Sequence, residues 1–218
     1  MKEAYICFTR IPQAGQVKTR LMPFLSPEQC AALQAAMLRD IAGQTERLHA
    51  DIFVCHTGLT PGILRDIFPH AGFFPQSADE SLGLRMYRAL CHVLSLGYGA
   101  CVLTGSDLPY LSAAHIESAF NALLRSDIVL GPTKDGGYYL VGLKAPCPAL
   151  FMHKRYGHTS VYSDAVAAAK AAGKSSISVA ACNDIDTADD LRALWAANKC
   201  NGSHTAAFLK TVFQKEEP

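Results

Sequence analysis

Short apolar runs alternate with longer amphipathic stretches along most of the chain. Six of these runs predict β-strands, at residues 4–9, 51–56, 100–104, 127–130, 138–143 and 176–180. The first run reads Ala-Tyr-Ile-Cys-Phe-Thr. An apolar run of this length is typical of a strand buried on both faces of a parallel sheet.

Capping residues mark where several of the intervening helices begin. Ser26, Pro27 and Gln29 form a capping box with proline at the first helical position, and they open a helix that reaches about residue 48. Thr187 and Asp190 form a second capping box, before a helix over residues 188–198. Further helices are predicted at residues 60–68, 81–96, 112–125, 159–173 and 203–213.

This alternation of strands and helices predicts an α/β fold, a three-layer α/β/α sandwich with a mostly parallel sheet. The chain has 218 residues and contains no linker, repeat or low-complexity tract that would divide it. We therefore predict a single domain over residues 1–218.

Composition narrows the class of protein. Half of the residues are hydrophobic, 18% are charged and the net charge is +1, so neither nucleic acid nor an anionic membrane is an expected partner. No apolar run reaches the roughly 18 residues that span a bilayer. The eight cysteines are scattered, without a C-x-x-C pair, and predict reduced thiols in a cytoplasmic protein.

In a parallel sheet, ligands bind outside the carboxyl ends of the strands. The loop after the first predicted strand contains Arg10, Gly15, Lys18 and Arg20, a composition that suits a phosphate cradle. It is not a Walker loop, and a solvated basic loop is the alternative.

Two further loops contain acidic residues beside turn formers. Asp107 follows the most apolar strand, where it suits a divalent-metal ligand, although Asp followed by Pro109 also begins ordinary turns. Asp135 precedes Gly136 and Gly137, which permit close approach of the backbone to a ligand. A β-hairpin with a glycine-rich turn is the alternative for this loop.

The fourth loop follows the last predicted strand. Asp184 and Asp186 fall on one side of an extended segment, because side chains repeat every two residues. Thr187 serves as the helix cap, which leaves both acids available for another task. The alternative is that they interact favourably with the dipole of the following helix.

Together the loops contain four motifs: F-x-[KR]-x-P-x-x-G-x-V-K-T-R-L, G-S-D-x-P-x-L, G-P-x-x-D-G-G-Y-Y-L-x-G-L and D-x-D-T-x-x-D-L. This set resembles the nucleotide-diphospho-sugar transferase superfamily, in particular the glycosyltransferase-like family associated with radical-SAM and selenoprotein-type genes. Gln76 and residues 82–86 resemble a further segment of that family. The resemblance covers residues 5 to about 194 and implies a GT-A-like fold. Tyr156 departs from it, because the family usually has Trp there, and residues from 200 onward have no counterpart.

The resemblance implies a role for each basic residue. Lys18 and Arg20 would neutralise phosphate charge, and Lys18 would also act in catalysis. Gly15 would let the backbone approach the phosphates. Arg10 and Arg85 would complete the nucleotide-binding set.

It also implies an acidic and an acceptor set. Asp107 would act in catalysis and hold Mg²⁺ or Mn²⁺, with Asp186 and Asp184 as further ligands. Asp135 would be the catalytic base if the reaction uses one. It would also bind the substrate, a role shared by three residues, Gly136, Gly137 and Tyr138.

The resemblance favours glycosyl transfer from a nucleotide-sugar donor to a small-molecule acceptor. Nucleotidyl transfer from a nucleoside triphosphate to a phosphorylated acceptor, as in phospholactate guanylyltransferases, is the alternative. A binding module without turnover is a third, which the four intact loops disfavour. The donor, the acceptor and the formation of a homo-oligomer are left open by the motifs.

Overall fold

A computed structural model describes residues 1–58, 62–79, 81–152, 156–197 and 202–214, and seven strands within them form one sheet. The strands are β1 (Glu3–Thr9), β2 (Asp51–His56), β3 (Gly72–Pro75), β4 (Ala100–Thr104), β5 (Ile128–Pro132), β6 (Tyr138–Leu143) and β7 (Ser176–Ser178). They lie in the order β3-β2-β1-β4-β6-β5-β7. β6 is antiparallel to β4 and β5, and the other neighbours are parallel, so the prediction of a mostly parallel sheet is confirmed.

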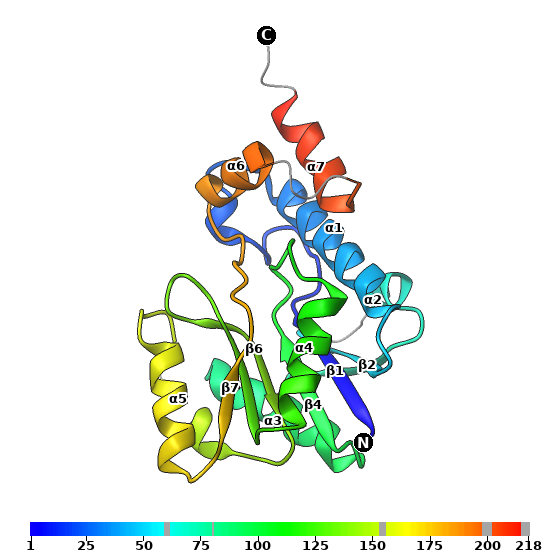
Figure 1. Cartoon of the computed structure of the whole chain (residues 1–218). Coiled ribbons are helices and arrows are strands. Elements are labelled where there is room, and N and C mark those ends of the chain that lie inside the picture. The colour runs from blue at the N-terminus through cyan, green and yellow to red at the C-terminus, as the bar shows by residue number, and fades with distance from the viewer. Residues whose placement is uncertain (59–61, 80, 153–155, 198–201, 215–218) are drawn as a thin grey trace.

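Helices cover both faces of this sheet (Figure 1). One face packs against α1 (Pro27–Thr45), α2 (Gly62–Ile67) and α4 (Ala113–Leu123), and the other against α3 (Leu82–Ser95) and α5 (Val161–Ala171). Successive residues of β1 enter opposite cores, because side chains alternate along a strand. Tyr5 lies in the α1 core and Ile6 in the α3 core. The predicted three-layer α/β/α sandwich is confirmed.

The sheet contains one strand that the pattern of apolar runs does not predict. β3 is absent from the predicted strands, because four residues that begin with glycine and end with proline give little strand signal. β3 is an edge strand, where proline costs no ladder hydrogen bond. Residues 60, 61 and 198, where two predicted helices begin or end, lie outside the described residues. No helix in the described part of the chain is long and apolar enough to cross a membrane.

The order of the strands decides where a ligand can bind. The chain moves from β1 outward to β2 and β3, then returns to place β4 on the other side of β1. The carboxyl ends of β1 and β4 therefore flank a topological switch point, which is the usual binding position in open α/β sheets. Because β6 is antiparallel, the loop from β5 to β6 reaches the same edge of the sheet.

A third core lies at this edge, outside the two faces. It joins α6 (Ala188–Ala197) and α7 (His204–Phe213) to the first half of α1 and to the 3-10 helix η1 (Thr19–Leu21). Figure 1 shows α6 and α7 beside the start of α1. Asp40 of α1 accepts hydrogen bonds from the backbone N–H groups of His204 and Thr205, at 2.7 and 2.9 Å. The predicted helix at 203–213 is therefore present and held by α1.

The substitution Asp40→Ala removes the carboxylate that binds two backbone N–H groups at the start of α7. Loss of such a cap costs about 1–2 kcal/mol, so we expect the free energy of unfolding to fall by that amount. Chemical denaturation measures the change. Glu117→Ala, on the exposed side of α4, is the control and should stay within about 0.5 kcal/mol. Equal stability of both variants would show that α7 does not depend on Asp40.

Candidate active site

The loops that follow β1, β4, β5 and β7 meet around one cavity of about 580 Å³ at the carboxyl edge of the sheet. This volume is in the range of small-molecule sites. All the predicted site residues line the cavity except Gly15 and Gly136. Segments that the sequence separates widely therefore form one site.

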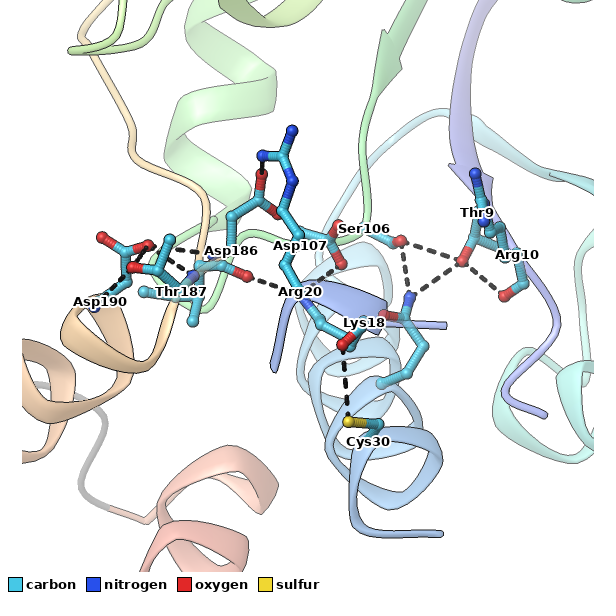
Figure 2. A network of polar contacts seen from close by, with 12 residues as sticks. Thr9, Arg10, Lys18, Arg20, Cys30, Ser106, Asp107, Asp186, Thr187 and Asp190 are labelled. Atoms are coloured by element: carbon cyan, nitrogen blue, oxygen red, sulfur yellow. Dashed lines mark hydrogen bonds and ion pairs between the residues drawn. The ribbon is translucent and has the colours of Figure 1, made fainter. Parts of the chain in front are cut away.

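The ammonium group of Lys18 lies at the centre of this site. Its side chain is 2% exposed, and Nζ lies 2.7 Å from Asp107 Oδ1. Nζ also donates a 2.8 Å hydrogen bond to the carbonyl oxygen of Ile185, whose own N–H donates to the carbonyl oxygen of Asp107 at 2.9 Å. Figure 2 shows Lys18 beside Asp107. A buried charge must be paired. Because the partners of Lys18 lie in the loops after β4 and β7, its side chain connects these loops to the loop after β1.

The backbone of Lys18 is also constrained. Its φ of 51° and ψ of 37° lie in the left-handed region, and among the described residues it is the one non-glycine residue with a positive φ. Its carbonyl oxygen accepts hydrogen bonds from Leu21 N–H at 2.8 Å and from Cys30 Sγ at 3.6 Å. Strain of this kind persists where surrounding contacts enforce it, and it occurs often at functional sites.

Arg20 forms a second ion pair, at the mouth of the cavity. Its Nη1 lies 3.1 Å from Asp186 Oδ2, while the side chain stays 75% exposed. Arg10 is exposed as well, and its Nη1 donates to the carbonyl oxygen of Gln16 at 3.2 Å. Lys18 is thus committed inside the fold, whereas Arg10 and Arg20 are exposed at the cavity, where a ligand can reach them.

The carboxylates of Asp107, Asp184 and Asp186 concentrate negative charge on one side of the cavity. Burial, and then the charge of Asp186, raise the pKa of Asp184 to about 6. Burial and the charge of Asp107 likewise raise the pKa of Asp186, although Lys18 and Arg20 oppose the shift. A further cation beside these groups would relieve their repulsion.

A divalent metal ion at these acids would need further ligands from outside the chain, such as phosphate oxygens. Within the described ranges, no three His, Cys, Asp or Glu side chains are grouped so that they could hold a metal ion by themselves. Mg²⁺ usually binds through one or two carboxylates together with substrate phosphates and water. Asp107 and Asp186 provide two carboxylates. The predicted set of three ligands, with Asp184, stays a prediction.

The capping box predicted before α6 is present. Thr187 Oγ1 accepts a hydrogen bond from Asp190 N–H at 3.2 Å. Asp190 Oδ2 accepts from the N–H groups of Thr187 and Asp186, at 2.8 and 3.2 Å. Asp190 accepts from the N–H groups at the start of the helix. The carboxylates of Asp184 and Asp186 are therefore not needed as helix caps and remain available at the cavity.

The loop between β5 and β6 is organised by Asp135. Its Oδ1 accepts hydrogen bonds from Thr133 Oγ1 and from Gly137 N–H, the second at 3.1 Å. This is the local pattern by which Asp stabilises tight turns. The loop between β5 and β6 therefore forms a tight turn and also part of the cavity wall.

The two predicted site glycines that lie outside the cavity, Gly15 and Gly136, have roles in the local fold. Gly136 has a φ of 87°, and a Cβ there would lie 1.9 Å from the carbonyl oxygen of Thr159. Its own carbonyl oxygen accepts from Tyr162 N–H at 2.9 Å, so it lets the loop pack against the start of α5. Gly15, with a φ of 79°, turns the exposed first loop, and a Cβ at this position would have no neighbour within 4 Å among the described residues.

Sequence reasoning missed a buried polar cluster below the ion pairs. Gln34 Nε2 donates to Ser106 Oγ at 2.8 Å and to Thr9 Oγ1 at 3.2 Å, and Thr9 Oγ1 donates to Ser106 Oγ at 3.0 Å. All three side chains are buried and line the cavity. A glutamine on the apolar face of α1 was the available signal. The cluster holds the ends of β1 and β4 together beside Asp107.

A second polar pair lies on the β3 side of the cavity. Gln76 Nε2 donates to the carbonyl oxygen of Thr9 at 2.9 Å, and Gln76 Oε1 lies 3.4 Å from Arg85 Nη1. Arg85 Nε is buried and has no hydrogen-bond partner within the described residues. An unpaired guanidinium nitrogen beside a cavity is a ready donor for a ligand.

The chain is similar to one described family of bacterial proteins and to proteins named as transferases. A family model described as "Uncharacterized protein conserved in bacteria (DUF2064)" matches residues 40–158. A solved structure from Desulfovibrio desulfuricans G20, described as a "putative nucleotide-diphospho-sugar transferase", is 32% identical with a TM-score of 0.88. That similarity covers 97% of this chain and 95% of the other.

Two further proteins are more distantly similar. The 2-phospho-L-lactate guanylyltransferase of Methanothermobacter thermautotrophicus is 27% identical over 209 residues, which cover 89% of this chain and 85% of that protein. A cytidylyltransferase from Leptospira borgpetersenii is 14% identical with a TM-score of 0.62, over 99% of this chain and 94% of the other. The second similarity shows the fold alone.

The substitution Lys18→Met tests the ion pair at the centre of the site. It leaves Asp107 without its partner, and breaking a buried pair is strongly destabilising. Because Asp107 is 40% exposed, water offsets part of the loss, and we expect the free energy of unfolding to fall by about 2 kcal/mol.

Arg20→Met is the matched control, because the pair of Arg20 with Asp186 is exposed and should contribute less than about 1 kcal/mol. Denaturant titration of Lys18→Met, Asp107→Asn and the double variant gives the coupling energy between the two residues. Additive effects of the two substitutions would contradict the assigned pair.

Proposed function

The chain belongs to the DUF2064 family of bacterial proteins, and we propose that it transfers a nucleotidyl group from a nucleoside triphosphate to a phosphorylated small molecule. The observation that carries this proposal is the position of four cationic side chains, Arg10, Lys18, Arg20 and Arg85, around one cavity. The cavity lies at the switch point between β1 and β4. A triphosphate brings more negative charge to such a site than a nucleotide sugar does.

The ion pairs prepare the site for this charge before a ligand binds. Lys18 is held in place by Asp107 and Ile185, and its field acts at the cavity without reorganisation. Fixed charges aimed at developing charge are a major source of rate enhancement in enzymes. Arg20, exposed at the mouth, would bind the leaving pyrophosphate, and Arg10 would bind a further phosphate.

Asp107 and Asp186 would hold a divalent metal ion with the phosphates. When bound, the ion would supply Lewis-acid neutralisation of phosphate charge. The proposed reaction needs no covalent intermediate on the protein. A phosphate oxygen of the acceptor attacks the α-phosphorus of the donor, the bond from the α-phosphorus to the bridging oxygen breaks, and pyrophosphate leaves.

The distant curated relative supports nucleotidyl transfer, since that protein is named a guanylyltransferase. Glycosyl transfer is the second candidate, and the description of the Desulfovibrio desulfuricans G20 protein favours it. The two reactions differ in their need for a base. In glycosyl transfer, the hydroxyl group that receives the sugar must lose a proton. In nucleotidyl transfer, the phosphate group of the acceptor is already ionised at neutral pH.

The released product distinguishes the two candidates. Purified protein with Mg²⁺ or Mn²⁺ is incubated with each nucleoside triphosphate and a panel of phosphomonoesters, and separately with nucleotide sugars. We expect acceptor-dependent pyrophosphate from at least one triphosphate, detected by phosphorus NMR. Release of a nucleoside diphosphate from a nucleotide sugar, with all triphosphates inert, would establish glycosyl transfer instead.

The substitution Arg20→Ala should weaken triphosphate binding. Removing one charged hydrogen bond to phosphate costs roughly 1.5–3 kcal/mol, or about ten- to a hundredfold in affinity. Calorimetric titration with triphosphate and with the plain nucleoside measures the difference, and only the first should change. Arg125→Ala, at an exposed position outside the cavity, is the control. An equal loss for nucleoside and triphosphate would show that Arg20 acts on the fold.

The substitution Asp135→Asn separates the two reactions by their need for a base. Asparagine keeps an oxygen that can accept from Gly137 N–H, so the loop should stay folded. With a phosphorylated acceptor we expect kcat to change less than about fivefold, since general-base catalysis contributes typically 10²–10⁴-fold where it operates. A loss of a hundredfold or more would assign a base to Asp135 and favour glycosyl transfer.

A further inference from the structure

The cavity has three parts that follow the order of the strands. The charged loops after β1 and β4 occupy the middle, and Gln76 lies on the side of β2 and β3. On the opposite side, at the start of β6, stand the aromatic rings of Tyr138 and Tyr156. The motifs and the proposed reaction leave Tyr156 without a role.

The two tyrosines form a hydroxyl pair inside the cavity wall. Their oxygens are 2.9 Å apart, and their rings meet edge to face with centroids at 6.3 Å. One hydroxyl donates to the other, so the proton of the accepting hydroxyl has no partner in the described parts of the chain. Burial raises the pKa of both groups, which keeps them neutral and able to donate near pH 7.

The glycine of the α3 segment explains how Tyr156 is positioned. A Cβ at Gly83 would lie 2.7 Å from Tyr156 Oη, 2.8 Å from its ring and 2.7 Å from the carbonyl oxygen of Phe151. Glycine at this point lets the Tyr156 ring lie against the first turn of α3. A side chain at this position would require either Tyr156 or the backbone at Phe151 to shift.

Apolar side chains lie beside this pair, since both tyrosines pack against the core cluster that contains Met86 and Val141. Leu82 and Met86 of α3, Val141 of β6 and Val161 of α5 line the same cavity. Leu82 is 38% exposed, so its side chain is accessible to a ligand in the cavity. A spare phenolic proton beside apolar carbon suits a ligand that joins an apolar group to an oxygen acceptor.

We propose that Tyr138 and Tyr156 form the acceptor subsite, and that the acceptor is a small phosphomonoester with an apolar carbon part. This rests on the proposed nucleotidyl transfer, in which the acceptor brings its own phosphate. The apolar part lies against Leu82, Met86 and Val161, and the spare phenolic proton donates to an oxygen of the acceptor. Tyr156 thereby determines acceptor specificity.

Two probes of similar charge test this subsite, phenyl phosphate and glycerol 3-phosphate. Titration followed by protein NMR should show tighter binding of phenyl phosphate, because only it has an apolar part. Tyr156→Phe keeps the ring and removes the hydroxyl, and should weaken phenyl phosphate binding about two- to tenfold. Affinity for a nucleoside triphosphate should stay unchanged.

Tyr162→Phe is the matched control. Its hydroxyl contacts Ser178 outside the cavity, so neither probe should be affected. Equal binding of phenyl phosphate to wild type and Tyr156→Phe, absence of its binding, or its displacement by a nucleoside would overturn the proposal. The outcome is separate from pyrophosphate release, because binding of the probe requires no turnover.

Discussion

The ion pair between Lys18 and Asp107 is the contact on which the rest of the site depends. The ammonium group of Lys18 is almost completely buried. It is paired with the carboxylate of Asp107 and donates a hydrogen bond to the carbonyl oxygen of Ile185. Without that charge, the loops after β1, β4 and β7 lose the group they share. Lys18 combines a left-handed backbone with the buried pair, so the local strain and the ion pair occur at one residue.

Contacts further out hold this arrangement in place. Gln34 binds the ends of β1 and β4 through Thr9 and Ser106. The C-terminal helices pack on α1 and η1, and α6 begins directly after Asp186 and its cap Thr187. The third core therefore positions one end of each ion pair, although it lies outside both faces of the sheet. α7, which lies beyond the motifs that carry the family resemblance, thus supports the site.

The sequence predicts much of this structure because its signals are local. The alternation of apolar runs and capping boxes indicates the strands and helices, and the switch-point rule then indicates which loops converge. Long-range contacts leave weaker signals. The commitment of Lys18 to an internal pair, the role of Gln34 and the contact of Gly136 with Thr159 all depend on residues far apart in the chain. The edge strand β3 is not predicted, because its four residues give little strand signal and its pairing with β2 is a long-range contact.

In the proposed reaction, the phosphates of a nucleotide donor bind where the loops after β1 and β4 meet. A crystal structure with Mn²⁺ and a non-hydrolysable nucleoside triphosphate tests this most directly, because anomalous scattering locates the metal. We expect a manganese peak between Asp107 and Asp186, with the phosphates beside Arg20. A triphosphate bound away from this edge, with no metal at either carboxylate, would contradict it.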